Sequence, residues 1–175
     1  MRTRRLLAGF MLLAASPALL VAAPAVAGGT DVCALVTRQE AGELLGYKVV
    51  KTTKKTSSID DSAECTYRTK KVQKAFKEEY DRDLKIQLEL TVGPVTDELR
   101  VDLQDVPFDD GERVEGLGDE AYATKFDQVI AISGTTAVSA KLQNYKGSPD
   151  KFRSVAESAV RAALPRLAEL TPSAS

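Results

Sequence analysis

Residues 84–92 read L-K-I-Q-L-E-L-T-V, and this stretch decides the fold class. Its apolar residues alternate strictly with polar ones, which is the period-two pattern of a strand with one buried and one wetter face. Strands buried on one face only are typical of antiparallel sheets. The chain should therefore contain an antiparallel sheet that is covered on one side. The apolar side of this strand is made by Leu84, Ile86, Leu88, Leu90 and Val92.

Helical patterns occur before and after this strand. Residues 37–46 begin with a T-x-x-E capping box at Thr37 and Glu40, and Gly46 is placed to end the helix. Residues 96–105 fit a second helix. The closing helix has Ser148 as its cap and Pro149 at its first position, followed by a continuous apolar stripe. The stripe consists of Phe152, Val155, Ala156, Ala159, Val160, Ala163 and Leu167.

Further strands are predicted at 47–52, 63–68, 120–125, 128–133 and 136–143, the last three joined by turns at 126–127 and 134–135. Residues 52–62 are polar and predict a loop, and 107–119 predict a long acidic turn region. The highly charged segment 69–83 fits either a short exposed helix or an extension of a hairpin. This order of elements predicts an α+β fold, an antiparallel sheet with helices packed on one face.

The N-terminal residues are typical of an export signal. Three arginines among the first five residues precede an apolar stretch, and Ala25-Val26-Ala27 gives the small-x-small pattern of a cleavage site. The alternative is an uncleaved membrane anchor, but Pro17 and Pro24 interrupt the apolar run. We expect a signal peptide at 1–27, a single secreted domain at 28–170 and a frayed tail at 171–175. The predicted location is extracellular, either free or associated with the cell envelope, and without a transmembrane segment after cleavage.

Two cysteines remain after export, Cys33 and Cys65. In an oxidising compartment, an even pair in a small secreted domain predicts a structural disulfide. The alternative is a reactive thiol pair, although the two residues lack C-x-x-C spacing and no histidine is present to lower a thiol pKa.

Charge and composition exclude several functions. Without the three signal arginines the 24 basic residues fall to 21 against 25 acidic ones, a net charge of −4, which excludes a generally basic, nucleic-acid-coating protein. The absence of histidine excludes Ser-His-Asp and Cys-His catalysis and histidine-containing zinc sites. A hydrolase that uses paired carboxylates stays open. We expect a protein that is not an enzyme.

The stretch G-L-G-D-E-A-Y at 116–122 has the G-x-G-x-x-A spacing of a dinucleotide-binding turn. That fingerprint requires a strand before the first glycine and a helix after the last. Here an acidic segment precedes it and a β-like one follows, so the glycines predict a tight turn and no cofactor. The nearby carboxylates could instead bind calcium, but they match no EF-hand loop, so we expect a solvated acidic surface and no metal. These residues are Asp105, Asp109, Asp110, Glu112, Glu115 and Asp119.

Charge is segregated along the chain. Residues 47–77 hold nine basic and three acidic residues, whereas 78–125 hold fifteen acidic and five basic ones. Such polarity can steer a charged partner, either an anionic envelope polymer or a protein, and it can also be ordinary solvated surface. The candidate partner-binding residues are Arg68, Lys70, Lys71, Lys74 and Lys77.

Four landmarks occur in order: C-A-L-V-T-R-Q-E-A-G-E-L-L-G at 33–46, C-T-Y at 65–67, V-E-G-L-G-D-E-A-Y at 114–122, and the closing amphipathic helix. Together they resemble a family of secreted proteins and lipoproteins of unknown function from actinobacteria. The resemblance implies an envelope or extracellular location and a structural pair of Cys33 and Cys65. Many relatives carry a lipid-modified cysteine at the processed N-terminus, which this chain lacks. The family has no established catalytic residues to transfer.

The sequence favours a secreted, non-enzymatic domain that binds a protein or envelope partner through a sheet face or the charged segments. One alternative is a carrier of a small apolar ligand between the sheet and the closing helix, because Ala156, Ala159 and Ala163 are small enough to leave room. Close helix–sheet packing explains the same alanines. The other alternative is the carboxylate-dependent hydrolase.

Overall fold

The computed structural model describes residues 31–72, 74, 77–78, 83–97, 99, 111–124 and 128–170. The predicted signal peptide at 1–27, the tail at 171–175 and the turn at 126–127 lie outside these residues. So do most of the predicted helix 96–105, about half of the segment 69–83, and three of the acidic candidates, Asp105, Asp109 and Asp110.

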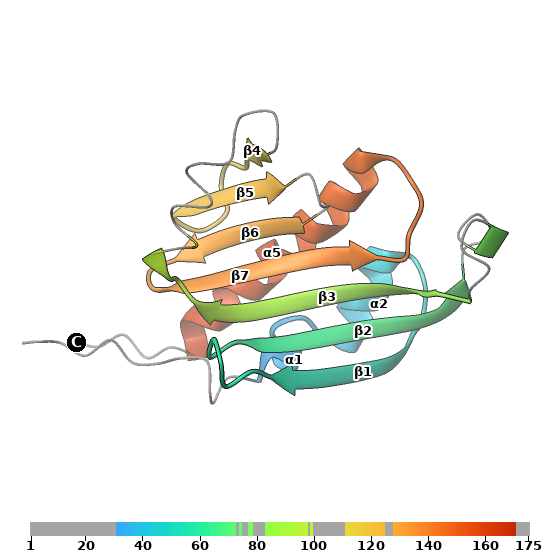
Figure 1. Ribbon diagram of the computed structural model, residues 1–175, viewed down its shortest axis with the longest axis horizontal. Helices are drawn as coiled ribbons and strands as arrows, with labels where there is room; N and C mark the ends of the chain where they lie inside the picture. The colour runs from blue at the N-terminus through green and yellow to red at the C-terminus, as the bar shows by residue number, and fades with distance from the viewer. Residues whose placement is uncertain are drawn as a thin grey trace, which may run out of the picture.

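The described residues form one antiparallel sheet of seven strands, with the helices on one of its faces (Figure 1). The strand order across the sheet is β1-β2-β3-β7-β6-β5-β4. The predicted α+β fold, with helices packed on one face, is confirmed. The strands are β1 (Val49–Thr56), β2 (Ala63–Val72), β3 (Lys85–Pro94), β4 (Gly111–Arg113), β5 (Glu120–Thr124), β6 (Gln128–Ser133) and β7 (Thr136–Gln143). The helices are α1 (Val32–Leu35), α2 (Arg38–Leu45) and α5 (Pro149–Leu170).

Strand β3 joins the two halves of the sheet. Its alternation holds as predicted, since Ile86, Leu88 and Leu90 have no exposed surface. On one side β3 pairs with β2, and on the other it pairs with β7, with Leu90 opposite Ala140. The meander β5-β6-β7 is thereby placed beside β3, although 41 residues separate the end of β3 from the start of β7 along the chain. This long-range pairing gives the sheet a single continuous core.

The helices cover the core face as their sequence patterns predict. Helix α2 begins with the complete capping box of Thr37 and Glu40, and Gly46 ends it in the left-handed conformation at φ 71°. The Ala156, Ala159 and Ala163 side chains of α5 are fully buried in the core. Helix α5 contacts β6 and β7, and small residues allow such close approach. Within the described ranges, no helix is both long and apolar enough to cross a membrane.

The structure differs from the predictions in four places. Strand β1 continues to Thr56, so the predicted loop 52–62 is wrong in its first half, because pairing with β2 holds this polar stretch extended. Strand β2 extends to Val72, as a hairpin extension, while Lys74, Lys77 and Glu78 are helical. The short strand β4 lies inside the predicted acidic turn region. Helix α1 was not predicted, since four residues are too few to show a period.

Candidate partner-binding edge

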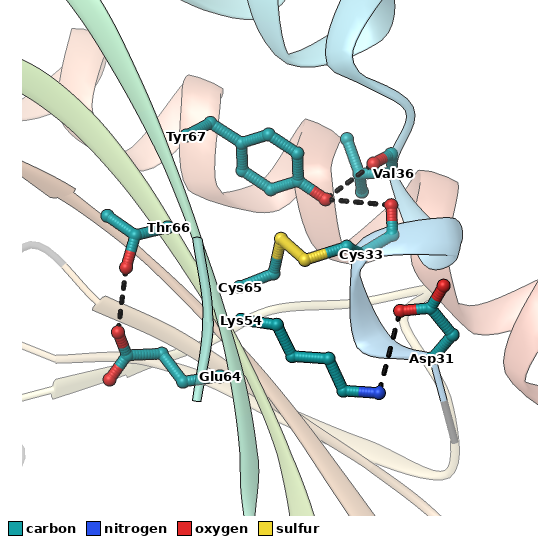
Figure 2. Close-up of a disulfide and its surroundings, with 8 residues drawn as sticks. All are labelled: Asp31, Cys33, Val36, Lys54, Glu64, Cys65, Thr66 and Tyr67. Atoms are coloured by element: carbon teal, nitrogen blue, oxygen red, sulfur yellow. Dashed lines mark hydrogen bonds and ion pairs between the residues drawn. A yellow bond between two sulfur atoms is a disulfide. The ribbon is translucent and has the colours of Figure 1, made fainter. Parts of the chain in front are cut away.

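The disulfide joins the first helix to the sheet. Cys33 on α1 and Cys65 on β2 are bonded, with their Cα atoms 5.2 Å apart (Figure 2). The structural pairing is therefore confirmed, and the alternative of a free thiol pair is wrong. The bond holds α1 against the central part of the β1–β2 hairpin.

Tyr67 holds the same helix from the neighbouring position on β2. Its hydroxyl donates to the carbonyl oxygen of Val36 and lies 3.3 Å from that of Cys33 (Figure 2). Burial raises the pKa of Tyr67, and the carboxylates of Asp31 and Glu40 raise it further. The phenol therefore stays a neutral donor to the carbonyl oxygen of the buried Val36.

The G-L-G-D stretch is a turn, as predicted, and it packs on the β6–β7 hairpin. Gly116 and Gly118 have φ of 71° and 59°. The Asp119 amide donates to the carbonyl oxygen of Ile132 at 2.7 Å, and its carboxylate accepts from the Gly134 amide at 2.7 Å. The stretch leads into β5, so no helix N-terminus meets it as a dinucleotide turn requires.

Two of the three acidic candidates that the structure describes are engaged in separate interactions. Glu112 forms an ion pair with Arg153 of α5, while Asp119 caps the β6–β7 turn as described above. Among the described residues, no group of three or more His, Cys, Asp or Glu side chains is arranged to hold a metal ion. The calcium alternative has no support from this part of the chain.

The five predicted partner-binding residues lie toward one end of the β2–β3 hairpin, and four of them contact other described residues. Arg68 donates to Gln87 Oε1 at 3.3 Å on the helix-free face. Lys71 Nζ lies 6.0 Å from the centre of the Tyr47 ring. Ion pairs engage two others, Lys74 with Glu78 at 3.5 Å and Lys77 with Asp83 at 3.0 Å. Lys70 is exposed.

A second group of lysines lies along β1, which is an edge strand of the sheet. We call Lys48, Lys51, Lys54 and Lys55 the basic edge. Lys54 pairs with Asp31 at 3.6 Å and Lys55 with Glu64 at 3.5 Å. Lys48 and Lys51 are exposed and form no ion pair within the described residues. The sequence prediction placed Lys48 and Lys51 in a strand at 47–52 and Lys54 and Lys55 in the loop 52–62, so it did not show that Lys51, Lys54 and Lys55 share one edge strand.

An open hollow of about 600 Å³ lies between α2 and the start of β1, next to the basic edge. Glycines and aliphatic parts of longer side chains form most of its wall. Arg38 is held at its rim by a hydrogen bond from Nε to the carbonyl oxygen of Val49, 2.9 Å long. The signal in the sequence is the spacing of Gly42 and Gly46, which removes two side chains from one side of α2. The lining residues are Arg38, Gln39, Gly42, Glu43, Gly46, Lys48 and Val49.

Two carboxylates share the helix-free face of neighbouring strands. Glu89 on β3 accepts from Gln143 Nε2 at 2.6 Å, and burial raises its pKa, with a smaller contribution from Glu64 on β2. Glu64 itself accepts from the hydroxyl of Thr66 at 2.7 Å and pairs with Lys55. Their environments differ, which is what a pair of catalytic carboxylates requires. No described pocket accompanies them.

Comparison of the chain with protein-family models, curated proteins and solved structures found no match. The resemblance to actinobacterial secreted proteins therefore stays a prediction.

Proposed function

We propose that this chain is a secreted, non-enzymatic binding domain that recognises an acidic protein or envelope partner at its basic edge. The observation that supports the proposal is the group of four lysines on and next to β1. Only two of them, Lys54 and Lys55, have a carboxylate partner in the described part of the chain. The edge therefore carries positive charge that the described residues do not neutralise.

Positive charge at this place favours an anionic partner for two reasons. It accelerates the encounter with an acidic surface by electrostatic steering, and the effect weakens as salt screens it. It also repels basic surfaces, so it contributes to the choice of partner. The disulfide and the Tyr67 hydrogen bond hold α1 against the same hairpin, so the edge is presented on a rigid support.

The proposal is tested by cross-linking the protein to its partner in its own secretion medium. The variant Lys48→Glu/Lys51→Glu reverses the two lysines that have no carboxylate partner. The matched control Lys85→Glu/Lys151→Glu makes the same change of net charge at two exposed lysines away from the edge. We expect the wild type and the control to capture the same partner, and the edge variant to lose it.

Two results would overturn the proposal. The wild-type protein could capture no partner at any salt concentration. Alternatively, both double variants could lose the partner equally, which would assign binding to net charge rather than to the edge.

A further inference from the structure

We infer that the partner contributes an extended acidic peptide segment, which adds to the sheet beside β1 and places one apolar side chain in the hollow next to α2. This inference rests on the proposed function and specifies the chemistry of the partner. Strand addition is a known mode of peptide recognition, in which main-chain hydrogen bonds supply affinity and pockets for alternate side chains supply specificity.

The first support is the orientation of the β1 backbone. The Ser57 amide donates to the carbonyl oxygen of Ser62 at 2.8 Å, so Ser57 and Ser62 form a hydrogen-bonded pair of the hairpin. Hydrogen-bonded and non-hydrogen-bonded pairs alternate along antiparallel strands. The register pairs Thr56 with Ala63 and Thr52 with Tyr67, so these are non-hydrogen-bonded pairs. The backbone groups of Thr52 and Thr56 therefore point away from β2, toward the open edge.

The open edge is available over the length of a strand. β1 has eight residues, and among the described residues it pairs with β2 alone. Both Thr52 and Thr56 are exposed. An edge of this length is a template for another strand.

The second support is charge, which decides between a second copy of this chain and an acidic peptide. β1 contains three lysines and no acidic residue. Lysine on an edge strand opposes pairing with a like strand, because the same charges would lie opposite one another. Lys51 and Lys55 both lie on the helix-free face, four residues apart along β1. Their partners on β2 are Arg68 and Glu64. An added strand with acidic residues on that face would meet both lysines.

The third support is the hollow on the other face of β1. Thr52 pairs with the buried Tyr67, so its side chain lies on the helix side of the sheet, as does that of the buried Val49. An added strand would direct every second side chain to this side. Near Val49 such a side chain would meet the hollow, whose volume of about 600 Å³ is ample for one apolar group. The expected ligand therefore alternates acidic and apolar residues.

The test uses the purified protein and a synthetic probe peptide of sequence EVEVELEVE, with blocked termini. The readout is an NMR titration with amide hydrogen exchange. We expect saturable binding, with new protection of the Thr52 and Thr56 amides. Replacing the single leucine of the peptide with glycine should weaken binding by about tenfold, because the hollow loses its occupant.

Two controls separate strand addition from charge attraction. A peptide of the same composition without alternation keeps the charge but cannot present one acidic face. A peptide with N-methyl groups on alternate amides keeps every side chain but loses its main-chain donors. Each should bind at least about tenfold more weakly than the probe.

The protein variant Thr52→Pro removes one outward amide, and proline is tolerated on edge strands, so the fold should persist. The variant should bind at least about tenfold more weakly, with unchanged far-UV circular dichroism. Should it misfold, the N-methylated peptide gives the same test on the wild-type protein.

Three results would overturn the inference: no binding of the probe, equal binding of the N-methylated peptide, or protection confined to amides far from β1. If any of these occurred while Lys48→Glu/Lys51→Glu still lost the native partner, the proposed function would stand and strand addition alone would fail. If the wild-type protein captured no partner, the proposed function itself would fail.

Discussion

Arg166 on α5 binds Glu40 on α2 with both of its terminal nitrogens. Nη2 lies 2.6 Å from Oε1 and Nη1 lies 2.8 Å from Oε2. Nη1 also donates to the carbonyl oxygen of Leu35 at 2.8 Å, so one guanidinium connects α1, α2 and α5. The same carboxylate accepts from the Thr37 amide at 2.7 Å and completes the capping box. Glu40 is thus both a local cap and a tertiary contact.

Substitution Glu40→Gln should remove the contribution of the ionised Glu40 carboxylate to the free energy of unfolding. The pH dependence of that contribution should disappear with it. The hydrogen bond from Arg166 is the main cause that lowers the pKa of Glu40, from 4.5 to about 2, and bonds from Thr37 add to it. A carboxyl group whose pKa is lower in the folded protein stabilises the fold at pH values above its pKa in the unfolded chain. This stabilisation is lost as the pH falls from about 4.5 toward 2. Since a third of the side chain is exposed, we expect the variant to lose only about 1 kcal/mol at pH 7.

The measurement is urea unfolding of both proteins between pH 7 and pH 2.5. The difference in the free energy of unfolding between the wild type and Glu40→Gln should shrink as the pH falls. The control Glu43→Gln changes an exposed glutamate of the same helix, bonded to Gln39 at 3.0 Å, and should match the wild type at every pH. If the difference in the free energy of unfolding between the wild type and Glu40→Gln stayed constant with pH, the lowered pKa of Glu40 would be contradicted.

Removal of the disulfide should lower the free energy of unfolding substantially. Cys33 and Cys65 are 32 residues apart, and closing a loop of this length stabilises the fold by about 3–4 kcal/mol on the chain-entropy model. Thermal unfolding of Cys33→Ala/Cys65→Ala, compared with wild type with and without reductant, measures the effect. Thiol titration of the unfolded, unreduced wild type should find no free thiol, and two reactive thiols would refute the pairing.

Substitution Gly118→Ala should be much more damaging than Gly116→Ala. Both glycines have positive φ, so alanine at either position costs about 1–2 kcal/mol of backbone strain. At Gly118 the added Cβ would also lie 2.3 Å from the carbonyl oxygen of Ile132, whereas at Gly116 it would have nothing within 4 Å. The clash must displace the bond between Asp119 and Ile132. Chemical denaturation should show Gly118→Ala to be less stable than Gly116→Ala by about 2 kcal/mol, and equal stabilities would contradict this packing.

Substitution Tyr67→Phe should lower stability by about 1–3 kcal/mol, because it leaves the buried carbonyl of Val36 without its donor. Burial is the main cause that raises the pKa of Tyr67, so the wild type should lose stability as the pH rises above the ordinary value of 10.0, where the unfolded chain ionises. The difference in the free energy of unfolding between the wild type and Tyr67→Phe should therefore become smaller above that pH. The control Tyr47→Phe removes a hydroxyl from a more exposed ring and should have little effect.

Sequence alone determined the features that depend on neighbours along the chain. The capping box at Thr37 and Glu40 set the start of α2, and Gly46 set its end, because both act within one helical turn. The alternation of residues 84–92 determined which side of β3 is buried, since the side-chain period of a strand is two. The two cysteines limited the pairing to one choice once export was predicted.

Only the tertiary structure decided the features that join distant segments. The pairing of β3 with β7 and the contact of Arg166 with Glu40 unite residues far apart in sequence, and periodicity carries no information about such partners. The same reason explains the candidate site. Lys54 and Lys55, which the sequence predicted to lie in a loop, are on an edge strand because β2 pairs with them. The hollow exists because α2 packs beside the start of that strand.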